Sequence, residues 1–304
     1  MKQNHISINV CTYKRNHTLA RLLRKLKEQE SGGFFSFSII LIDNDPNGMA
    51  QEVANRAREE LHLEIKYEIE PERSIPAARN RALSLSEGNY IAIIDDDEFP
   101  PPHWLITLYR AIQTFEVDGA LGPVFPYFEQ TPPDWLIKGG FCERPVLRTG
   151  TLLKWHQTRT GNVLMKRKVF DEYGLKFDLR WKTSGSDRAF FKEAINLGYR
   201  FIAVAEAPVF EIIPPERWKK AYYLKRALVH GYNSYQNSIK GTSLFKEITT
   251  ALRSALAIII YILGLPLSLL FGTHWLVKCL EKGGHHLSQL LARLRIQLIK
   301  KREF

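Results

Sequence analysis

The chain has 304 residues, of which 45% are hydrophobic and 25% charged, and its formal net charge is +11. This length and apolar content suffice for a large core, in one domain or in a domain with an appendage. Three scattered cysteines without a CxxC spacing exclude a disulfide framework and a cysteine-based metal site, and they favour a reducing compartment.

The first 115 residues alternate strand-like and helix-like segments. Short apolar runs predict strands, and apolar residues at helical spacing predict helices. Strands are expected at 6–11, 37–42, 63–69 and 90–94, and helices at 16–30, 49–61, 75–85 and 102–115. Alternation of this kind predicts an α/β fold, with a mainly parallel sheet and helices on both faces. Ligands of such sheets bind at the carboxyl ends of the strands.

The second half of the chain is less regular. Residues from about 121 to 160 are rich in proline, glycine and aromatic side chains, which predicts irregular loops over the site. Regular elements follow, in chain order: a strand at 162–165, a helix at 187–197 and strands at 201–204 and 208–213.

The C-terminal part differs in charge and hydropathy. Residues 215–304 hold 15 basic and 4 acidic residues, which accounts for the whole net charge. The run 254–277 has no formal charge and is long enough to span a bilayer. Gly264 and Pro266 near its middle, between basic flanks, suit a re-entrant hairpin, and a single span is the alternative. Basic and apolar residues together favour an anionic membrane surface over nucleic acid as the partner.

The end of the chain shows a leucine pattern. Leucines recur at helical spacing over 287–298, with arginine and lysine between them. This pattern predicts a helix lying in a membrane interface, and a helix packed on the protein is the alternative. We therefore divide the chain into a domain at 1–243 and a hydrophobic and basic, membrane-associating tail at 244–304.

An acidic cluster follows the strand at 90–94. Residues 91–100 read IAIIDDDEFP, so that Asp95, Asp96, Asp97 and Glu98 crowd together at the strand's exit. Neighbouring carboxylates raise one another's pKa, so either a positive group offsets the repulsion or the cluster is a hydrated acidic turn. A Mg²⁺ or Mn²⁺ ion bound by carboxylates and substrate phosphates is one such group. Asp95 and Asp97 are two residues apart and point to the same side of an extended chain.

Other polar residues stand at neighbouring strand ends. Thr12 ends the first strand, Asp43 and Asp45 end the second, and Arg79 lies in the helix at 75–85. Together with the acidic cluster they offer partners for a base and ribose, a cation for a diphosphate and carboxylates for a metal. The sequence has no GxxxxGK[ST] motif, so it predicts a nucleotide-diphosphate site without a P-loop.

These motifs occur together in a known family. CTYKRN, LIDNDPNG, ARNRAL, GNYIAIIDDDEFP and TSGSDRAFF follow one another as they do in family 2 glycosyltransferases of the GT-A fold. The resemblance covers roughly residues 5–235, and the chain is most similar to bacterial enzymes of the exopolysaccharide and lipopolysaccharide type. It implies that 1–243 is a GT-A catalytic domain.

The resemblance assigns a role to individual residues. Contacts with the donor nucleotide fall to five of them: Thr12, Asp43, Arg79, Asp95 and Asp96. Mn²⁺ or Mg²⁺ falls to Asp97 and Asp95 of the DxD motif. Glu211 stands where many relatives have a histidine, and it is either a further metal ligand or structural.

The general base implied by the resemblance is Asp187. It lies in GSDRAF, where Ser186 replaces the family's usual glutamate and loosens the match. The alternative for Asp187 is an N-cap on the helix that follows. Gly161 and Asn162 either face a sugar or form a turn with a capping side chain.

The implied function is an inverting, metal-dependent transfer of sugar from a nucleotide-diphosphate sugar. The acceptor is expected to be a lipid-linked glycan or a lipopolysaccharide core, at the cytoplasmic face of a bacterial inner membrane. Two alternatives remain open: a nucleotidyltransferase, and an inactive membrane-bound scaffold that keeps the fold.

Overall fold

The computed structural model describes residues 4–181 and 185–299. The chain divides into two compact units, one of residues 1–127 and 144–212 and one of residues 128–143 and 213–304. The division at 243 that we expected, between a catalytic domain and a tail, stays a prediction.

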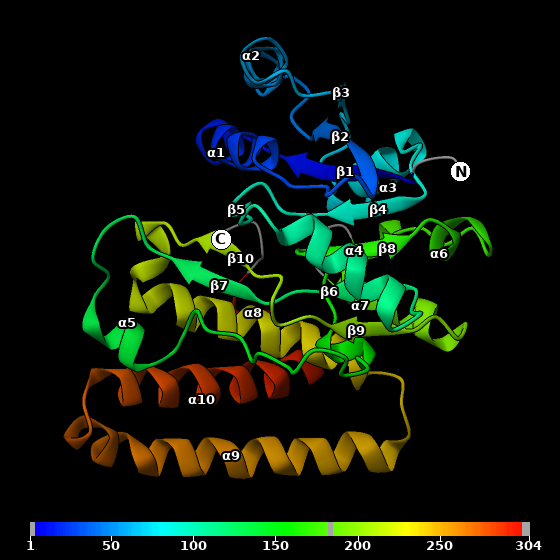
Figure 1. The fold of residues 1–304 in the computed structure, drawn as a ribbon. Helices are drawn as coiled ribbons and strands as arrows, with labels where there is room; N and C mark the ends of the chain where they lie inside the picture. The colour runs from blue at the N-terminus through cyan, green and yellow to red at the C-terminus, as the bar shows by residue number, and fades with distance from the viewer. Residues whose placement is uncertain (1–3, 182–184, 300–304) are drawn as a thin grey trace. The chain divides into compact units, whose positions relative to one another are not determined.

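All strands of the described chain lie in the first unit (Figure 1). They are β1 (Asn4–Thr12), β2 (Phe35–Asp43), β3 (Ile65–Ile69), β4 (Tyr90–Ile93), β5 (Glu98–Phe99), β6 (Gly119–Leu121), β7 (Val124–Tyr127), β8 (Val163–Lys166), β9 (Phe201–Ala203) and β10 (Val209–Ile212). A seven-stranded sheet has the order β3-β2-β1-β4-β8-β6-β9, and a three-stranded sheet has the order β5-β10-β7. In the larger sheet only β8 runs antiparallel to its neighbours, which confirms the mainly parallel sheet.

Helices of the first unit are α1 (Asn16–Lys27), α2 (Gln51–Leu61), α3 (Ile75–Leu85), α4 (Trp104–Thr114), α6 (Lys168–Asp171) and α7 (Ser186–Asn196), with short 3-10 helices at Trp155–Gln157 and Leu179–Trp181. Helices of the second unit are α5 (Asp134–Lys138), α8 (Lys220–Ser238), α9 (Leu244–Leu270) and α10 (Thr273–Arg293), with a 3-10 helix at Pro215–Trp218.

Alternating side chains of β2 show how both faces of the large sheet are covered. Ile39 and Leu41 belong to one core cluster, which also holds the buried leucines of α1 and the apolar side of α4. Ile40 and Ile42 point to the other face and pack against α3 at Ala78. Successive residues of a strand face opposite sides, so a fully apolar strand requires a helix layer on each.

The loops expected at about 121–160 are only partly irregular. This stretch contains β7, α5 and a 3-10 helix, and β5 and β6 were not expected at all. Strands of two to four residues are too short to show a period, which is why the sequence pattern missed them. Gly122 shows how tightly the chain is packed here, because a Cβ at this residue would lie 1.8 Å from the carbonyl oxygen of Ala207.

The break expected in the apolar run was misplaced. Helix α9 continues through Gly264 and Pro266 to Leu270, and the chain reverses at Gly272, whose φ of 100° suits glycine. Helices α9 and α10 therefore form a hairpin within the second unit (Figure 1). Among the residues described, α9 is the one helix long and apolar enough to cross a membrane.

The helix expected at the end of the chain is α10, and it stops at Arg293. Leu294 and Leu298 lie beyond its end and are exposed, so the leucine pattern does not form one helical face. The helix instead packs on α8, where Ser288 Oγ donates a hydrogen bond of 2.5 Å to the Leu228 carbonyl. For the helical part, the structure favours the alternative of a helix packed on the protein.

Candidate functional site

The positive charge of Arg15 partly offsets the repulsion between the carboxylates of the acidic cluster. Strands β1 and β4 are parallel neighbours, so the residues that follow them meet at one edge of the sheet. Arg15 Nη1 donates hydrogen bonds of 2.8 Å to Asp96 Oδ1 and of 2.8 Å to Asp97 Oδ2. Thr12 Oγ1 donates to the other oxygen of Asp96 at 2.7 Å. Asp96 is thus buried with both oxygens bound, while Asp97 shares its cation with it.

Arg79 approaches the same cluster from α3. Its Nη2 lies 3.5 Å from Asp95 Oδ1, and its side chain is only 12% exposed, whereas that of Asp95 is 45% exposed. The guanidinium also lies over the ring of Phe177 at 5.5 Å. Asp95 is therefore open to solvent on one side and faces a fixed positive charge on the other.

Burial disfavours the charged form of the carboxylates in the acidic cluster, despite these cations. It raises the pKa of Asp97 from 3.8 to about 7, against the opposing effect of Arg15 and together with the charges of Asp95, Asp96 and Glu211. Burial likewise raises the pKa of Asp96, and it raises that of Glu98 well above the ordinary value. Further positive charge at this edge would relieve the cluster.

Glu98, the last member of the acidic cluster, faces a further carboxylate in the small sheet. Glu98 and Glu211 are directly opposed across the antiparallel strands β5 and β10. Arg144 Nη2 pairs with Glu211 Oε2 at 2.5 Å, and burial lowers the pKa of the neighbouring Arg159. The amide of Ile212 donates to the Asp97 carbonyl at 2.8 Å and so holds the acidic loop against β10. Glu211 is in an ion pair here, and its role as a metal ligand stays a prediction.

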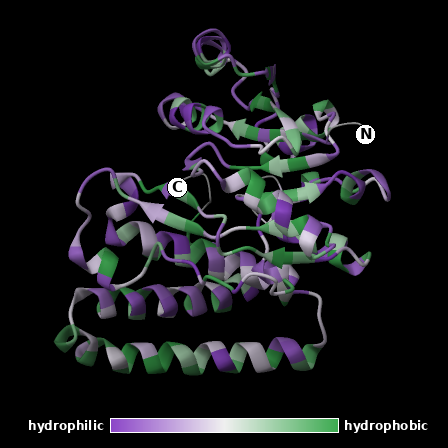
Figure 2. Ribbon diagram, in the orientation of Figure 1, coloured by the Kyte–Doolittle hydropathy of each residue, from purple (hydrophilic) through white to green (hydrophobic). Residues whose placement is uncertain are grey.

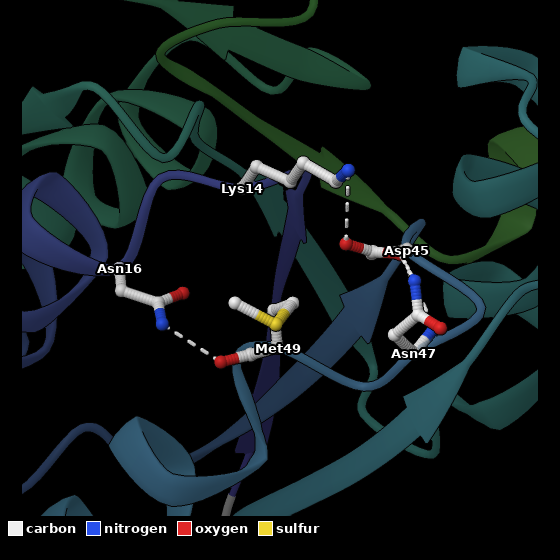
Figure 3. Close-up of a pocket in the computed structure, with 5 residues that line it drawn as sticks. All are labelled: Lys14, Asn16, Asp45, Asn47 and Met49. Atoms are coloured by element: carbon white, nitrogen blue, oxygen red, sulfur yellow. Dashed lines mark hydrogen bonds and ion pairs between the residues drawn. The ribbon is translucent and has the colours of Figure 1, made fainter.

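A cavity of about 310 Å³ opens beside the ends of β1 and β2 (Figure 3). Its lining consists of Lys14, Asn16, Asp45, Asn47 and Met49. Asp45 Oδ1 accepts hydrogen bonds from the amide and the side chain of Asn47. Asp45 Oδ2 is buried, accepts no hydrogen bond from the described residues and lies 3.8 Å from Lys14 Nζ. Asp45 Oδ2 is thus paired with a cation but lacks a hydrogen-bond donor among the described residues.

Asp43 is fully buried next to this cavity. Its carboxylate accepts hydrogen bonds from the amides of Asp45 at 3.0 Å and Ala50 at 2.8 Å and from the Tyr67 hydroxyl at 3.0 Å. These bonds fix the loop that carries Asp45. Contact of Asp43 with a nucleotide stays a prediction.

Asp187 lies in the first turn of α7, whose N-cap is Gly185. The N-cap role that we weighed for Asp187 is therefore wrong. Its Oδ1 accepts a hydrogen bond of 2.8 Å from the Arg188 amide, and the side chain is half-buried. Residues 183 and 184 of the TSGSDRAFF motif lie outside the described residues. The role of Asp187 as general base stays a prediction.

Asn162 is structural. It is fully buried, its φ is 59°, and its amide nitrogen donates to the carbonyls of Pro123 and Ala207, each at 2.8 Å. Its Oδ1 accepts from Trp104 Nε1 at 2.6 Å. Gly161 is different, because a Cβ there would lie 2.7 Å from Glu98 Oε1 and 3.1 Å from Asp95 Oδ2. Glycine at 161 thus leaves room for the carboxylates.

The donor set fits a hard cation only in part. Within the described residues no three His, Cys, Asp or Glu side chains are grouped to hold a metal ion. Oxygen ligands from Asp95 and Asp97 suit Mg²⁺ or Mn²⁺, which commonly take one or two carboxylates and complete their shell with substrate phosphates. The site therefore fits a cation that arrives with a diphosphate.

Sequence reasoning missed the role of Arg15, the position of Glu98 opposite Glu211 and the missing hydrogen bond of Asp45 Oδ2. Arg15 stands in the CTYKRN motif three residues after Thr12, and parallel pairing of its strand with 90–94 was the signal that places a cation there. Glu98 was visible in the cluster, but its position opposite Glu211 depends on β5, a strand of two residues.

Residues 7–174 match the protein family described as "Glycosyl transferase family 2". The chain belongs to this family. It is 33% identical over 232 residues to the succinoglycan biosynthesis protein ExoM of Rhizobium meliloti (strain 1021). This alignment covers 75% of this chain and 73% of ExoM. It is 23% identical over 163 residues to the Escherichia coli UDP-Glc:alpha-D-GlcNAc-diphosphoundecaprenol beta-1,3-glucosyltransferase WfaP, over 53% of this chain and 61% of that protein.

Solved structures agree with this family 2 assignment at the level of the fold. S. aureus TarS 1-349 superposes with a TM-score of 0.55 at 14% identity, over 96% of this chain and 92% of that chain. Structures of the same protein in complex with UDP and with UDP-GlcNAc give TM-scores of 0.55 and 0.56. The GT-A fold and the glycosyltransferase class expected from the motifs are confirmed, and the relatives act in polysaccharide biosynthesis. The nucleotidyltransferase alternative is set aside.

Proposed function

We propose that this family 2 glycosyltransferase moves a sugar from a UDP-sugar to a lipid-linked saccharide, with inversion at the anomeric carbon and with a divalent cation. The observation that carries the proposal is the edge where Arg15 and Arg79 meet Asp95, Asp96 and Asp97. Such an edge binds the diphosphate of a nucleotide at the carboxyl ends of parallel strands.

The cavity beside β1 and β2 supports the nucleoside part of the donor. Asp45 Oδ2 has no hydrogen bond from the described residues and lies 3.8 Å from Lys14 Nζ, so an N–H of a base that reaches it would supply its missing donor. A uracil ring offers one such N–H. UDP in the complexes of TarS and UDP-Glc in the name of WfaP support uridine as the nucleoside.

The chain's own residues divide the chemistry between leaving group and nucleophile. An acceptor hydroxyl attacks the anomeric carbon, the bond from that carbon to the diphosphate breaks, and the electron pair leaves with the diphosphate oxygen. Arg79 and Arg15 stabilise the charge that develops there. Asp187 takes the proton of the attacking hydroxyl, since α7 presents a half-buried carboxylate in its first turn.

Asp97 and Asp95 would hold a divalent cation, which would supply additional neutralisation of the diphosphate. Burial raises the pKa of Asp97, and this carboxylate shares the Arg15 guanidinium with Asp96. A cation bound directly to Asp97 would therefore stabilise its charged form. Glu211 remains the candidate for a further oxygen ligand, with Arg144 as its present partner.

The second unit and one relative support a lipid-linked acceptor and a location at a membrane. WfaP acts on a sugar carried by diphosphoundecaprenol, which is a lipid of the membrane. The long apolar helix α9 and the basic C-terminal part suit an enzyme that works at the cytoplasmic face of a bacterial inner membrane. A lipopolysaccharide-core acceptor would be reached from the same surface.

A transfer assay tests the proposal. Purified protein is incubated with UDP-glucose or UDP-GlcNAc and a synthetic polyprenyl-diphosphate saccharide, with Mn²⁺ or with a chelator, and the lipid product is analysed by mass spectrometry and NMR. The expected result is a product one sugar larger, with the inverted linkage and only with metal. Full turnover in the chelator would contradict the metal role, and a retained linkage would contradict direct displacement.

A further inference from the structure

Helix α9 carries one continuous apolar face that nothing in the described chain covers. Six residues at spacings of three and four are each more than half exposed, from 55% at Ile259 to 81% at Leu270: Leu252, Leu256, Ile259, Leu263, Leu267 and Leu270. They extend over about 27 Å of helix. Figure 2 shows α9 as predominantly hydrophobic along most of this length.

The opposite face of α9 is attached to the other helices through polar groups. Ser254 lies about 200° around the helix from Leu256, and it is buried. Its hydroxyl donates to Gln289 Oε1 at 2.5 Å, and Gln289 Nε2 donates to Ser234 Oγ of α8 at 3.3 Å. Helix α9 is therefore one-sided: one face is held by α10, which in turn packs on α8, and the other face is apolar and bare.

Helix α10 decides how α9 can meet a bilayer. It packs along α9 (Figure 1), yet it carries Lys278, Glu281 and Lys282, and Glu281 pairs with Arg226 of α8 at 3.1 Å. A charged side chain at the bilayer centre costs several kcal/mol, so a helix of this composition does not accompany α9 across the hydrocarbon. A crossing of the membrane by α9 would have to break the hairpin.

The basic residues around α9 indicate that its apolar face meets an anionic lipid surface. Lys246 and Arg253 are exposed on the flank of α9, and the exposed Lys240 precedes its first residue, Leu244. The 15 basic and 4 acidic residues after position 214 make this part strongly cationic. Anionic lipid headgroups attract such residues while the apolar face enters the boundary of the acyl chains.

We propose that α9 lies in the plane of an anionic bilayer, with its bare face in one leaflet, and neither spans nor dips through it. This inference rests on the membrane setting of the proposed function and specifies its geometry. The hairpin of α9 and α10 then stays intact, and both ends of α9 remain on the same side of the membrane.

Vesicle flotation of the purified full-length chain tests the docking. The chain is expected to float with phosphatidylglycerol vesicles and to bind phosphatidylcholine vesicles much more weakly. Replacing Leu256 and Leu263 together with glutamine should weaken binding at least about 100-fold, because the loss of each buried leucine weakens binding roughly tenfold or more. Leu152→Gln is the matched control, since this leucine is 60% exposed in the first unit and its loss should leave binding unchanged.

Depth measurements test the orientation. Spin labels at Leu252→Cys, Leu263→Cys and Leu270→Cys, read against the labelled unsubstituted chain, should report equal depths of about 5–10 Å. A label at 263 that lies far deeper than those at 252 and 270 would overturn the in-plane orientation in favour of a span or a dip.

A second copy of this chain is the competing occupant of the apolar face. A lipid-free dimer that ignores vesicles and is dissociated by the double glutamine variant would overturn the proposal. Flotation needs neither donor nor acceptor, so binding without sugar transfer would contradict the proposed function alone. Transfer to a lipid-free acceptor without any flotation would contradict the docking alone.

Discussion

Replacement of Asp97 by asparagine should make the metal-free protein more stable at alkaline pH. Burial raises the pKa of this carboxyl from 3.8 to about 7, so the folded chain holds a proton that the unfolded chain has released. The folded state binds more protons between these two values, and stability therefore falls as the pH rises through this window. Stability is highest below the lower value and lowest above the upper one.

The size of the effect follows from the shift. About three pKa units correspond to a free energy on the order of 4 kcal/mol, of which roughly 3 kcal/mol falls between pH 5 and pH 8. Asparagine has the shape of aspartate, still accepts a hydrogen bond from Arg15 and does not titrate. The free energy of unfolding of Asp97→Asn should thus exceed that of the wild type at pH 8 and match it near pH 5.

Urea denaturation in a chelating buffer at both pH values measures this difference. Asp171→Asn is the matched control, because this aspartate is 60% exposed in its ion pair with Arg167, and its replacement should leave the pH profile of the wild type unchanged. An Asp97→Asn variant that loses as much stability as the wild type from pH 5 to pH 8, or that is less stable than the wild type at pH 8, would refute the reasoning.

Two further predictions concern the base and the buried turn. Asp187→Asn should keep the affinity for UDP and lower kcat at least about 100-fold, because only the proton acceptor is lost. Calorimetry measures the affinity and steady-state kinetics measures kcat. Normal turnover would exclude the role of Asp187 as general base. Asn162→Asp should lower the free energy of unfolding by about 3 kcal/mol or more, since a carboxylate would face the carbonyls of Pro123 and Ala207 in place of two donated hydrogen bonds. Thermal denaturation measures this loss, and an unchanged Tm would contradict the account of the turn.

Much of the fold was predictable because its signals are local. The helix expected at 75–85 has these bounds in the structure, with Ser74 as its N-cap and Pro76 in its first turn. The expected strand at 37–42 lies within β2, whose apolar run requires helices on both faces. The short strands β5 and β7 and the end of α10 depend on tertiary pairing, which leaves no period in the sequence.

The candidate site was likewise predictable in part from the sequence. Residue types at strand ends predicted that Thr12, Arg79 and the acidic cluster meet at one edge, and the structure brings them together. Parallel pairing of the strands predicts that Arg15 lies near this edge, but its bonds to Asp96 and Asp97 depend on side-chain geometry that no sequence pattern shows. The sequence leaves open whether Asn162 faces a sugar or caps a turn, and in the structure its side-chain nitrogen is fully used by carbonyls distant along the chain.

Calorimetric titration with UDP, in the presence and absence of Mn²⁺, tests the central claim most directly. The account predicts that wild-type protein binds UDP tightly only with Mn²⁺ and that Asp97→Asn loses this metal dependence together with the tight binding. GDP, CDP and dTDP in the same titration identify the nucleoside. Equal affinity for UDP with and without Mn²⁺ in the wild type would contradict a cation–diphosphate site at Asp95–Asp97.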